Sequence, residues 1–134
     1  MTNLLQKIVD YLNGLGIPTQ NVLPEFLIGK TGIILSAIGS STVKTFVGGS
    51  KLQALDILIV TTTLSGAEVS LNSDKVINIA NTLVNTQSLD LGDNLEFQEF
   101  EYINQNQVDI LEKLNAAGQV SFGVTLKLTY IQKG

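Results

Sequence analysis

The sequence predicts an α+β domain in which two helices pack on one face of a mainly antiparallel sheet. Apolar residues recur at helical spacing at the start of the chain and again after its middle. Elsewhere they alternate with polar residues, as in a half-buried strand, or run together, as in a fully buried one. Short breaks rich in Gly and Ser separate consecutive strands, which is typical of antiparallel hairpins.

The first predicted element is an amphipathic helix over residues 4–15. Its apolar positions lie three or four residues apart, and they are Leu4, Leu5, Ile8, Val9, Leu12 and Leu15. Gly14 and Gly16 are expected to end the helix, and Pro18 disfavours its resumption. Residues 17–29 are therefore expected to form a connecting loop.

Three strands are predicted next, over residues 31–38, 42–47 and 52–62. The breaks between them are Gly39-Ser40-Ser41 and Gly48-Gly49-Ser50, and the second of these is a strong hairpin signal. The third strand is apolar at nearly consecutive positions, so it is expected in the middle of the sheet with both faces covered.

A second helix is predicted over residues 72–85, with Asn72 or Ser73 as its cap. A strand over 95–102 follows, whose alternation slips at Gln98-Glu99, as a β-bulge would produce. The last strand, over 120–131, alternates without error. The period of residues 107–114 favours neither a helical turn nor an extended arm.

Size and composition indicate a single domain, 1–134, and remove several classes of function. The chain has 44% hydrophobic and 15% charged residues, which is typical of a globular protein. It contains no Cys, His or Arg, so it lacks thiolate and imidazole nucleophiles and bases, the commonest metal ligands, and bidentate phosphate recognition. The net charge of −4 disfavours nucleic-acid binding. No enzyme activity, cofactor or metal is therefore predicted.

Targeting signals are also missing from the pattern. The first ten residues are amphipathic and include Lys7 and Asp10, unlike a signal peptide. The apolar runs are far shorter than the roughly 18 residues that span a bilayer. The sequence thus predicts synthesis in a cytoplasm and no membrane partner.

Three local patterns are candidate binding or catalytic sites. Gly29-Lys30-Thr31 is similar to the end of a phosphate-binding loop, but Pro24 stands where the upstream glycine belongs and a strand follows, which favours an ordinary turn. An acidic run comprises Asp90, Asp93, Glu96, Glu99 and Glu101. Its spacing matches no calcium loop, and Glu96 and Glu101 alternate against Phe97 and Phe100, which favours solvated or partner-facing acids. Asp56 is expected to point outward or to pair with a lysine such as Lys44.

The order of these elements, together with three segments, resembles the tail-completion (tail-terminator) proteins of tailed bacteriophages, which are small minor-capsid and head–tail joining proteins. The segments are the Gly48-Gly49 turn leading into 52–60, the helix carrying Ile77-Asn78-Ile79-Ala80-Asn81, and the final strand from Phe122 to Tyr130. The likeness covers nearly the whole chain and concerns architecture more than any invariant motif. Residues 65–71 depart from it, as if inserted before the second helix.

The resemblance implies a virion structural protein that caps the finished tail tube as a ring, with six copies as the expected number, and forms the surface that joins the tail to the head. Its partners would be other copies of itself, the tail tube protein and the head connector or neck protein, at the head-proximal end of the tail. Candidate contacts are the hairpin tip, Gly48, Gly49, Ser50 and Lys51, and residues 105–119. Two alternatives stay open: another neck or minor capsid protein, and a small cytoplasmic protein-binding module.

Overall fold

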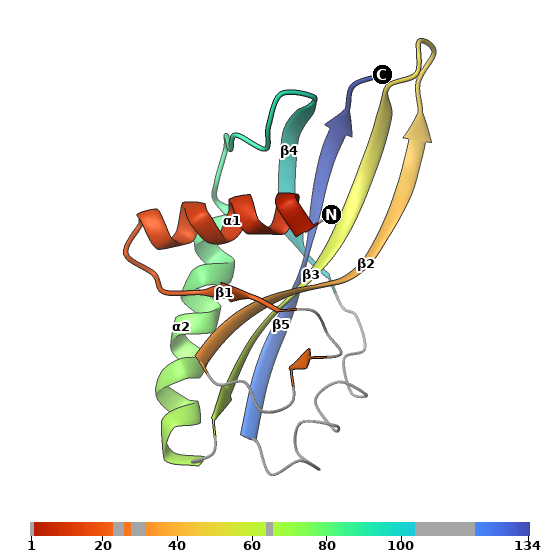
Figure 1. Cartoon of the computed structure of the whole chain (residues 1–134). Coiled ribbons are helices and arrows are strands. Elements are labelled where there is room, and N and C mark those ends of the chain that lie inside the picture. The colour runs from red at the N-terminus through yellow and green to blue at the C-terminus, as the bar shows by residue number, and fades with distance from the viewer. Residues whose placement is uncertain (1, 23–25, 28–31, 64–65, 104–119) are drawn as a thin grey trace.

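A computed structural model of the chain describes residues 2–22, 26–27, 32–63, 66–103 and 120–134. Its elements are α1 (Thr2–Gly14), β1 (Gln20–Asn21), β2 (Gly32–Thr45), β3 (Lys51–Thr63), α2 (Gly66–Val84), β4 (Leu95–Tyr102) and β5 (Val120–Gln132). The strands form one sheet in the order β1-β2-β3-β5-β4. The fold is therefore α+β, as predicted, with a five-stranded mixed sheet and two helices on one face of it (Figure 1).

The core lies between the helices and the sheet, and it explains why α1 and α2 form where they do. The apolar stripe of α1, which includes Ile8 and Leu12, and that of α2, which includes Ile79 and Leu83, are almost completely buried. These two stripes pack against the odd-numbered side chains of β3, such as Ile57, and against the even-numbered side chains of β5. Burying each such side chain contributes roughly 1.5–3 kcal/mol.

The sheet carries a second, smaller core on the face away from the helices, which we call the opposite face. Leu58 and Val60 of β3 point to this face, because they alternate with Ile57 and Ile59. They are buried together with Ile34 of β2 and with Leu27. β3 is thus a central strand covered on both faces, which confirms the prediction from its consecutive apolar residues.

The predicted break at Gly39-Ser40-Ser41 is wrong. β2 is one strand of 14 residues, and the register against β3 shifts between Ala37 and Gly39 and again between Thr42 and Lys44. The extra residue at each shift is accommodated as a β-bulge rather than a turn, since pairing with β3 continues on both sides. β2 and β3 therefore make one long hairpin instead of three separate strands with two turns.

Two further boundaries differ from the prediction. α2 begins at Gly66, so Asn72 and Ser73 lie inside the helix and do not cap it, and most of the stretch 65–71, expected as an insertion, is helical. The expected loop 17–29 contains β1, whose Gln20 and Asn21 pair in parallel with Ile34 and Leu35. The bulge predicted in 95–102 is confirmed, since the register of β4 shifts between Phe97 and Glu99.

Candidate functional site

The part of the sheet farthest from α2 is the most distinctive surface of the molecule. There the β2–β3 hairpin, the end of β5 and the start of β4 extend beyond the helix layer (Figure 1). We call this part the distal end; it comprises residues 39–56, 94–101 and 127–134. The side chains of residues 40–45 on β2 are all exposed. The structure thus presents a projecting sheet end with little cover on the outer strand.

The hairpin turn at the tip is built by two glycines. Gly48 and Gly49 have φ values of 100° and 96°, a region that residues with a Cβ rarely adopt. The N–H of Phe46 donates to the carbonyl of Ser50 at 2.8 Å, and the N–H of Gly49 donates to the carbonyl of Phe46 at 3.2 Å. The predicted contact residues Gly48, Gly49 and Ser50 therefore form a defined turn, with the fully exposed Val47 beside them.

The end of the described chain lies against this turn. A Cβ built on Gly134 would come within 2.7 Å of the carbonyl carbon of Gly49, so the two backbones are in close contact. The N–H of Lys133 donates to the carbonyl of Asn94 at 2.9 Å. The tip thus combines three chain segments that are far apart in sequence.

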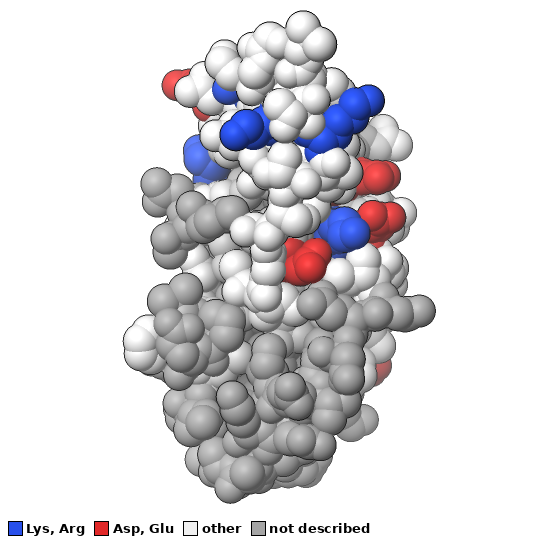
Figure 2. All heavy atoms as spheres, turned by 90° about the vertical axis from the view of Figure 1, so that its right-hand side faces the viewer, with Lys and Arg blue, Asp and Glu red and all other residues white. Residues whose placement is uncertain are grey.

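Lysines and acids alternate across the opposite face of the distal end. In one row of the sheet, Asp56 of β3 lies opposite Lys127 of β5, which in turn lies opposite Glu101 of β4. In a second row nearer the tip, Lys44 of β2 and Glu96 of β4 occupy the two outer strands. Figure 2 shows both signs of charge interspersed over the described part of this side of the molecule.

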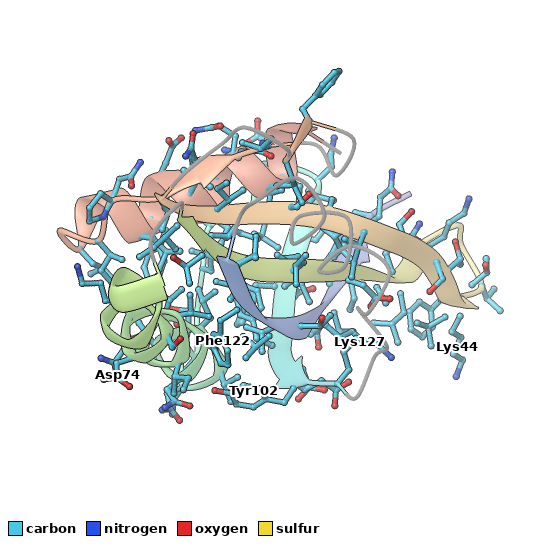
Figure 3. The ribbon with its side chains drawn as sticks, turned by 90° about the horizontal axis from the view of Figure 1, so that it is seen from below. Lys44, Asp74, Tyr102, Phe122 and Lys127 are labelled. Carbon is cyan, nitrogen blue, oxygen red and sulfur yellow. The ribbon has the colours of Figure 1, made fainter. Side chains whose placement is uncertain are left out.

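Asp56 lies on the opposite face across from a lysine of a neighbouring strand, as one of the predicted alternatives had it, but that lysine is Lys127 of β5 and not Lys44 of β2. The register places Leu52 opposite Lys44 and Gly39 opposite Asp56, because two bulges shift β2 relative to β3. Lys44 instead lies over the ring of Phe46, with its Nζ 5.4 Å from the ring centroid. Figure 3 shows Lys44 and Lys127 on the side of the sheet away from the helices, and Phe122 on the helix side.

On the helix side, the distal end carries mainly amide and hydroxyl groups, with Lys51 of β3 as a charged side chain in the row of Gln132. The hydroxyl of Thr42 donates to the Oε1 of Gln53 at 2.9 Å, and the Nε2 of Gln53 donates to the Oε1 of Gln132 at 3.2 Å. These side chains link three neighbouring strands. The two faces of the distal end are therefore chemically different.

The acidic run does not converge on one point. Asp90, Asp93, Glu96, Glu99 and Glu101 are all exposed, and the three glutamates of β4 lie on the opposite face while Phe97 and Phe100 face the helices. Within the described residues there is no cluster of three or more Asp, Glu, His or Cys that would hold a metal ion. The interpretation of these acids as solvated or partner-facing is consistent with this placement.

Two hollows occur elsewhere on the described surface. A wide one of about 710 Å³ is lined by Lys7, Asp10, Tyr11, Ser88, Leu89 and Asp90. A more apolar one of about 420 Å³ lies between the end of α1 and α2 and is lined by Gly16, Ile17, Pro18, Ile33, Lys75, Asn78 and Ile79. The first holds two carboxylates and one lysine in an open, solvated setting, which is unlike the enclosed, mostly apolar pockets that bind small molecules.

Two predicted regions lie outside the described residues: Lys30 and its neighbours in the phosphate-loop-like pattern, and the candidate contact segment 105–119. What the sequence reasoning missed is the length of the hairpin and the placement of Lys127 between two acids. The alternation of residues 120–131 predicts that Lys127 lies on a solvent-facing side of the sheet. The acids on either side of it follow only from the register of three strands.

No helix among the described residues is long and apolar enough to cross a membrane. A scan against models of known protein families and a search of the curated proteins both found no match. The case for a function therefore rests on the geometry of the distal end and on the resemblance of the element order.

Proposed function

We propose that the chain is a virion assembly protein that caps the finished tail tube of a bacteriophage as a ring, with six copies, and forms the joining surface between tail and head. The observation that carries the proposal is the distal end, a stiff hairpin that projects beyond the helix layer and ends in a tight turn. A ring subunit needs such a projecting surface to reach a protein outside the ring.

The chemistry of the tip suits contact with a protein. Val47 exposes its whole side chain, and Lys51 next to the turn is exposed as well. The turn is held by backbone hydrogen bonds and by the close approach of Gly134 to Gly49, so little conformational entropy is lost on docking. We assign the contact with the tail tube to Gly48, Gly49, Ser50 and Lys51 together with Val47.

The sheet also leaves surface for contacts between copies. A heterologous interface, in which two different patches of the same chain meet, generates a closed ring when the rotation closes. The chain has two different outer strands, β2 and β4, at opposite sides of the distal end. These features fit a ring better than a two-fold dimer built on a single patch.

Electron microscopy of the concentrated protein, and of tails to which it has been added, tests the proposal. We expect rings with six-fold symmetry and a width close to that of a tail tube, and added density at the head-proximal end of the tail. A protein that stays monomeric at all concentrations and leaves tails unchanged would contradict the proposal. The apolar hollow between α1 and α2 would then favour the small binding module.

A further inference from the structure

Both outer strands of the distal end have one side without a partner strand. β1 pairs only with Ile34 and Leu35, and no described strand lies beside the outer edge of β2 at residues 40–45. On the other side of the sheet, β5 is the one described strand that pairs with β4. The exposed side chains on both strands agree with edges that are open to a further strand.

The two open edges match in height and in length. Gly39 of β2 and Glu101 of β4 lie at the level of Lys127 on β5, through the pairs of β2 with β3 and of β3 with β5. Thr45 and Leu95 both lie at the level of Gln132. Each edge covers this span with seven residues, 39–45 and 95–101, because each contains one bulge there. The two edges therefore match at both ends of this span, with their bulges on either side of the level of Gln53 of β3.

The strand directions also match. β2 and β5 are both antiparallel to β3, and β4 is antiparallel to β5, so β2 and β4 run in opposite directions. A copy of the molecule rotated about an axis parallel to the strands brings its β4 beside β2 of the first copy in antiparallel orientation. The sheet then continues from one copy to the next with the same face on the same side.

The charges favour this pairing over the others. Side chains directly opposite each other on one face of a strand pair interact, and opposite charges stabilise the pair. At equal height, Lys44 on the opposite face of β2 meets Glu96 on the opposite face of the next copy's β4. A pairing of β4 with β4 would instead bring glutamates together, and one of β2 with β2 would leave Lys44 opposite a neutral residue or opposite its own copy.

We propose that copies of this chain join head to tail by sheet continuation, with β2 of one copy antiparallel to β4 of the next and Lys44 opposite Glu96. The proposal rests on the proposed function for the closure of the chain of copies into a ring, and it specifies the interface between the copies. Bulges and charges on edge strands also discourage unspecific pairing. Here the facing residues Lys44 and Glu96 carry opposite charges. The charges that discourage pairing with other strands therefore favour pairing between these two edges.

Charge reversal tests the direction of the pairing. Lys44→Glu places two acids at the 44–96 contact and Glu96→Lys places two lysines there, so each variant alone is expected to raise the dissociation constant for self-association at least about tenfold. An equimolar mixture of the two variants restores opposite charges at every contact, as does the double variant. Sedimentation velocity measures both, and Lys75→Glu on the exposed surface of α2 is the matched control.

Three outcomes would overturn the proposal. If two copies paired through their β2 edges, Glu96→Lys would associate as strongly as the wild type. If they paired through their β4 edges, Lys44→Glu would associate as strongly as the wild type. A mixture that associates no better than either variant alone would also be incompatible with head-to-tail contact.

Cross-linking supplies an independent readout that does not require a stable ring. The chain has no cysteine, so Lys44→Cys and Glu96→Cys introduce the only thiols. In the presence of a short thiol-reactive cross-linker, the double variant is expected to form a ladder of dimers, trimers and higher species. Mixing the two single variants is expected to give only dimers of unlike chains.

The two proposals fail in distinguishable ways. Wild-type rings, combined with no cross-link in the double-cysteine variant and no response to charge reversal, would exclude the edge pairing and leave the tail-completion function standing. A cross-linked ladder from a protein that neither closes into rings nor binds tails would support the edge pairing and count against the function. A wild type that does not associate at any concentration, together with a double-cysteine variant that gives no cross-link, would contradict both.

Discussion

Among the described residues, three buried hydroxyl groups have no hydrogen-bond partner: those of Ser36, Thr61 and Thr125. Ser36 and Thr125 flank Leu58 on the opposite face, one on each neighbouring strand. A buried hydroxyl without a partner costs about 1–3 kcal/mol, because it loses its hydrogen bonds to water and gains none. Ser36 and Thr125 are therefore weak points of the smaller core, while Thr61 lies on the helix side of β3.

Replacing Thr125 by Val is expected to stabilise the fold. Valine keeps the branched shape on the strand and removes the unpaired hydroxyl, so we expect a gain of about 1 kcal/mol in the free energy of unfolding and a melting temperature about 3–5 °C higher. Urea unfolding and calorimetry measure the two quantities.

Thr129→Val is the matched control, because Thr129 lies on the same face of β5 but is only half-buried. Its hydroxyl has access to solvent, so the change is expected to stay within about 0.5 kcal/mol. Equal effects of the two substitutions would show that burial of the hydroxyl is not the cause.

Tyr130 predicts how stability depends on alkaline pH. Its side chain is only 5% exposed, and burial raises the pKa of its phenol above 10.0. The unfolded chain ionises near 10.0 while the folded chain keeps its proton, so ionisation favours unfolding. The stability that this tyrosine contributes is complete below about pH 10 and is lost as the pH rises towards its folded-state pKa.

Tyr130→Phe removes this dependence. Relative to the variant, the wild type is expected to lose free energy of unfolding between about pH 9 and about pH 11, measured by urea unfolding at each pH. Tyr11→Phe, at a half-buried position of α1, controls for the general effect of losing a phenol. A constant difference between wild type and Tyr130→Phe over this range would refute the argument.

At the scale of the element, α2 separates buried from exposed positions within two turns. Leu83 is 0% exposed and Ile77 is 41% exposed. We expect Leu83→Ala to lower the free energy of unfolding by about 2–4 kcal/mol, since it removes apolar contact and leaves a cavity. Chemical denaturation monitored by circular dichroism gives the value.

Ile77→Ala serves as the control, with an expected change within about 0.5 kcal/mol, because alanine loses little contact there and has a better helix propensity. If both substitutions cost the same, the helix does not pack on the sheet through the face that contains Leu83.

The elements also show what could be predicted from the sequence. The helix stripes, the central position of β3 and the bulge in β4 all follow from periodicity, because burial imposes the period directly. The continuity of β2 does not follow from periodicity. Locally, Gly39-Ser40-Ser41 has the composition of a turn, and only pairing with β3 keeps these residues in a strand. β1, with two residues, is too short to show any period.

The candidate surface was predictable only in part, for the same reason. The tip residues Gly48 and Gly49 are marked by their composition, because a tight turn needs φ values that glycine tolerates. The opposition of Lys127 to Asp56, and the common height of Lys44 and Glu96, depend on the register of four strands. Register between strands that are distant in sequence leaves no local signal.

At the scale of the whole molecule, the tip and the sheet edges would serve different partners. Val47→Asp places a charge on a fully exposed side chain, so the free energy of unfolding is expected to change by less than about 0.5 kcal/mol. Binding to tail tubes is expected to weaken about tenfold, measured by co-sedimentation, while self-association is unchanged.

Leu15→Asp provides the comparison, since Leu15 is another exposed apolar residue but lies at the end of α1, away from the distal end (Figure 1). It is expected to leave tube binding intact. Loss of tube binding in both variants would indicate a general effect of surface charge and would remove the tip from the proposed contact.

The contact between Gly134 and Gly49 has a practical consequence for anyone who labels this protein. A fluorescent protein or affinity tag attached after Gly134 would emerge beside the hairpin turn, so in an assembly of identical copies every tag would point the same way. Such a fusion would act as a built-in marker of polarity in images, and it would also obstruct whatever the tip binds. A label intended to leave the tip accessible belongs on the outer surface of α2, for example at Lys75.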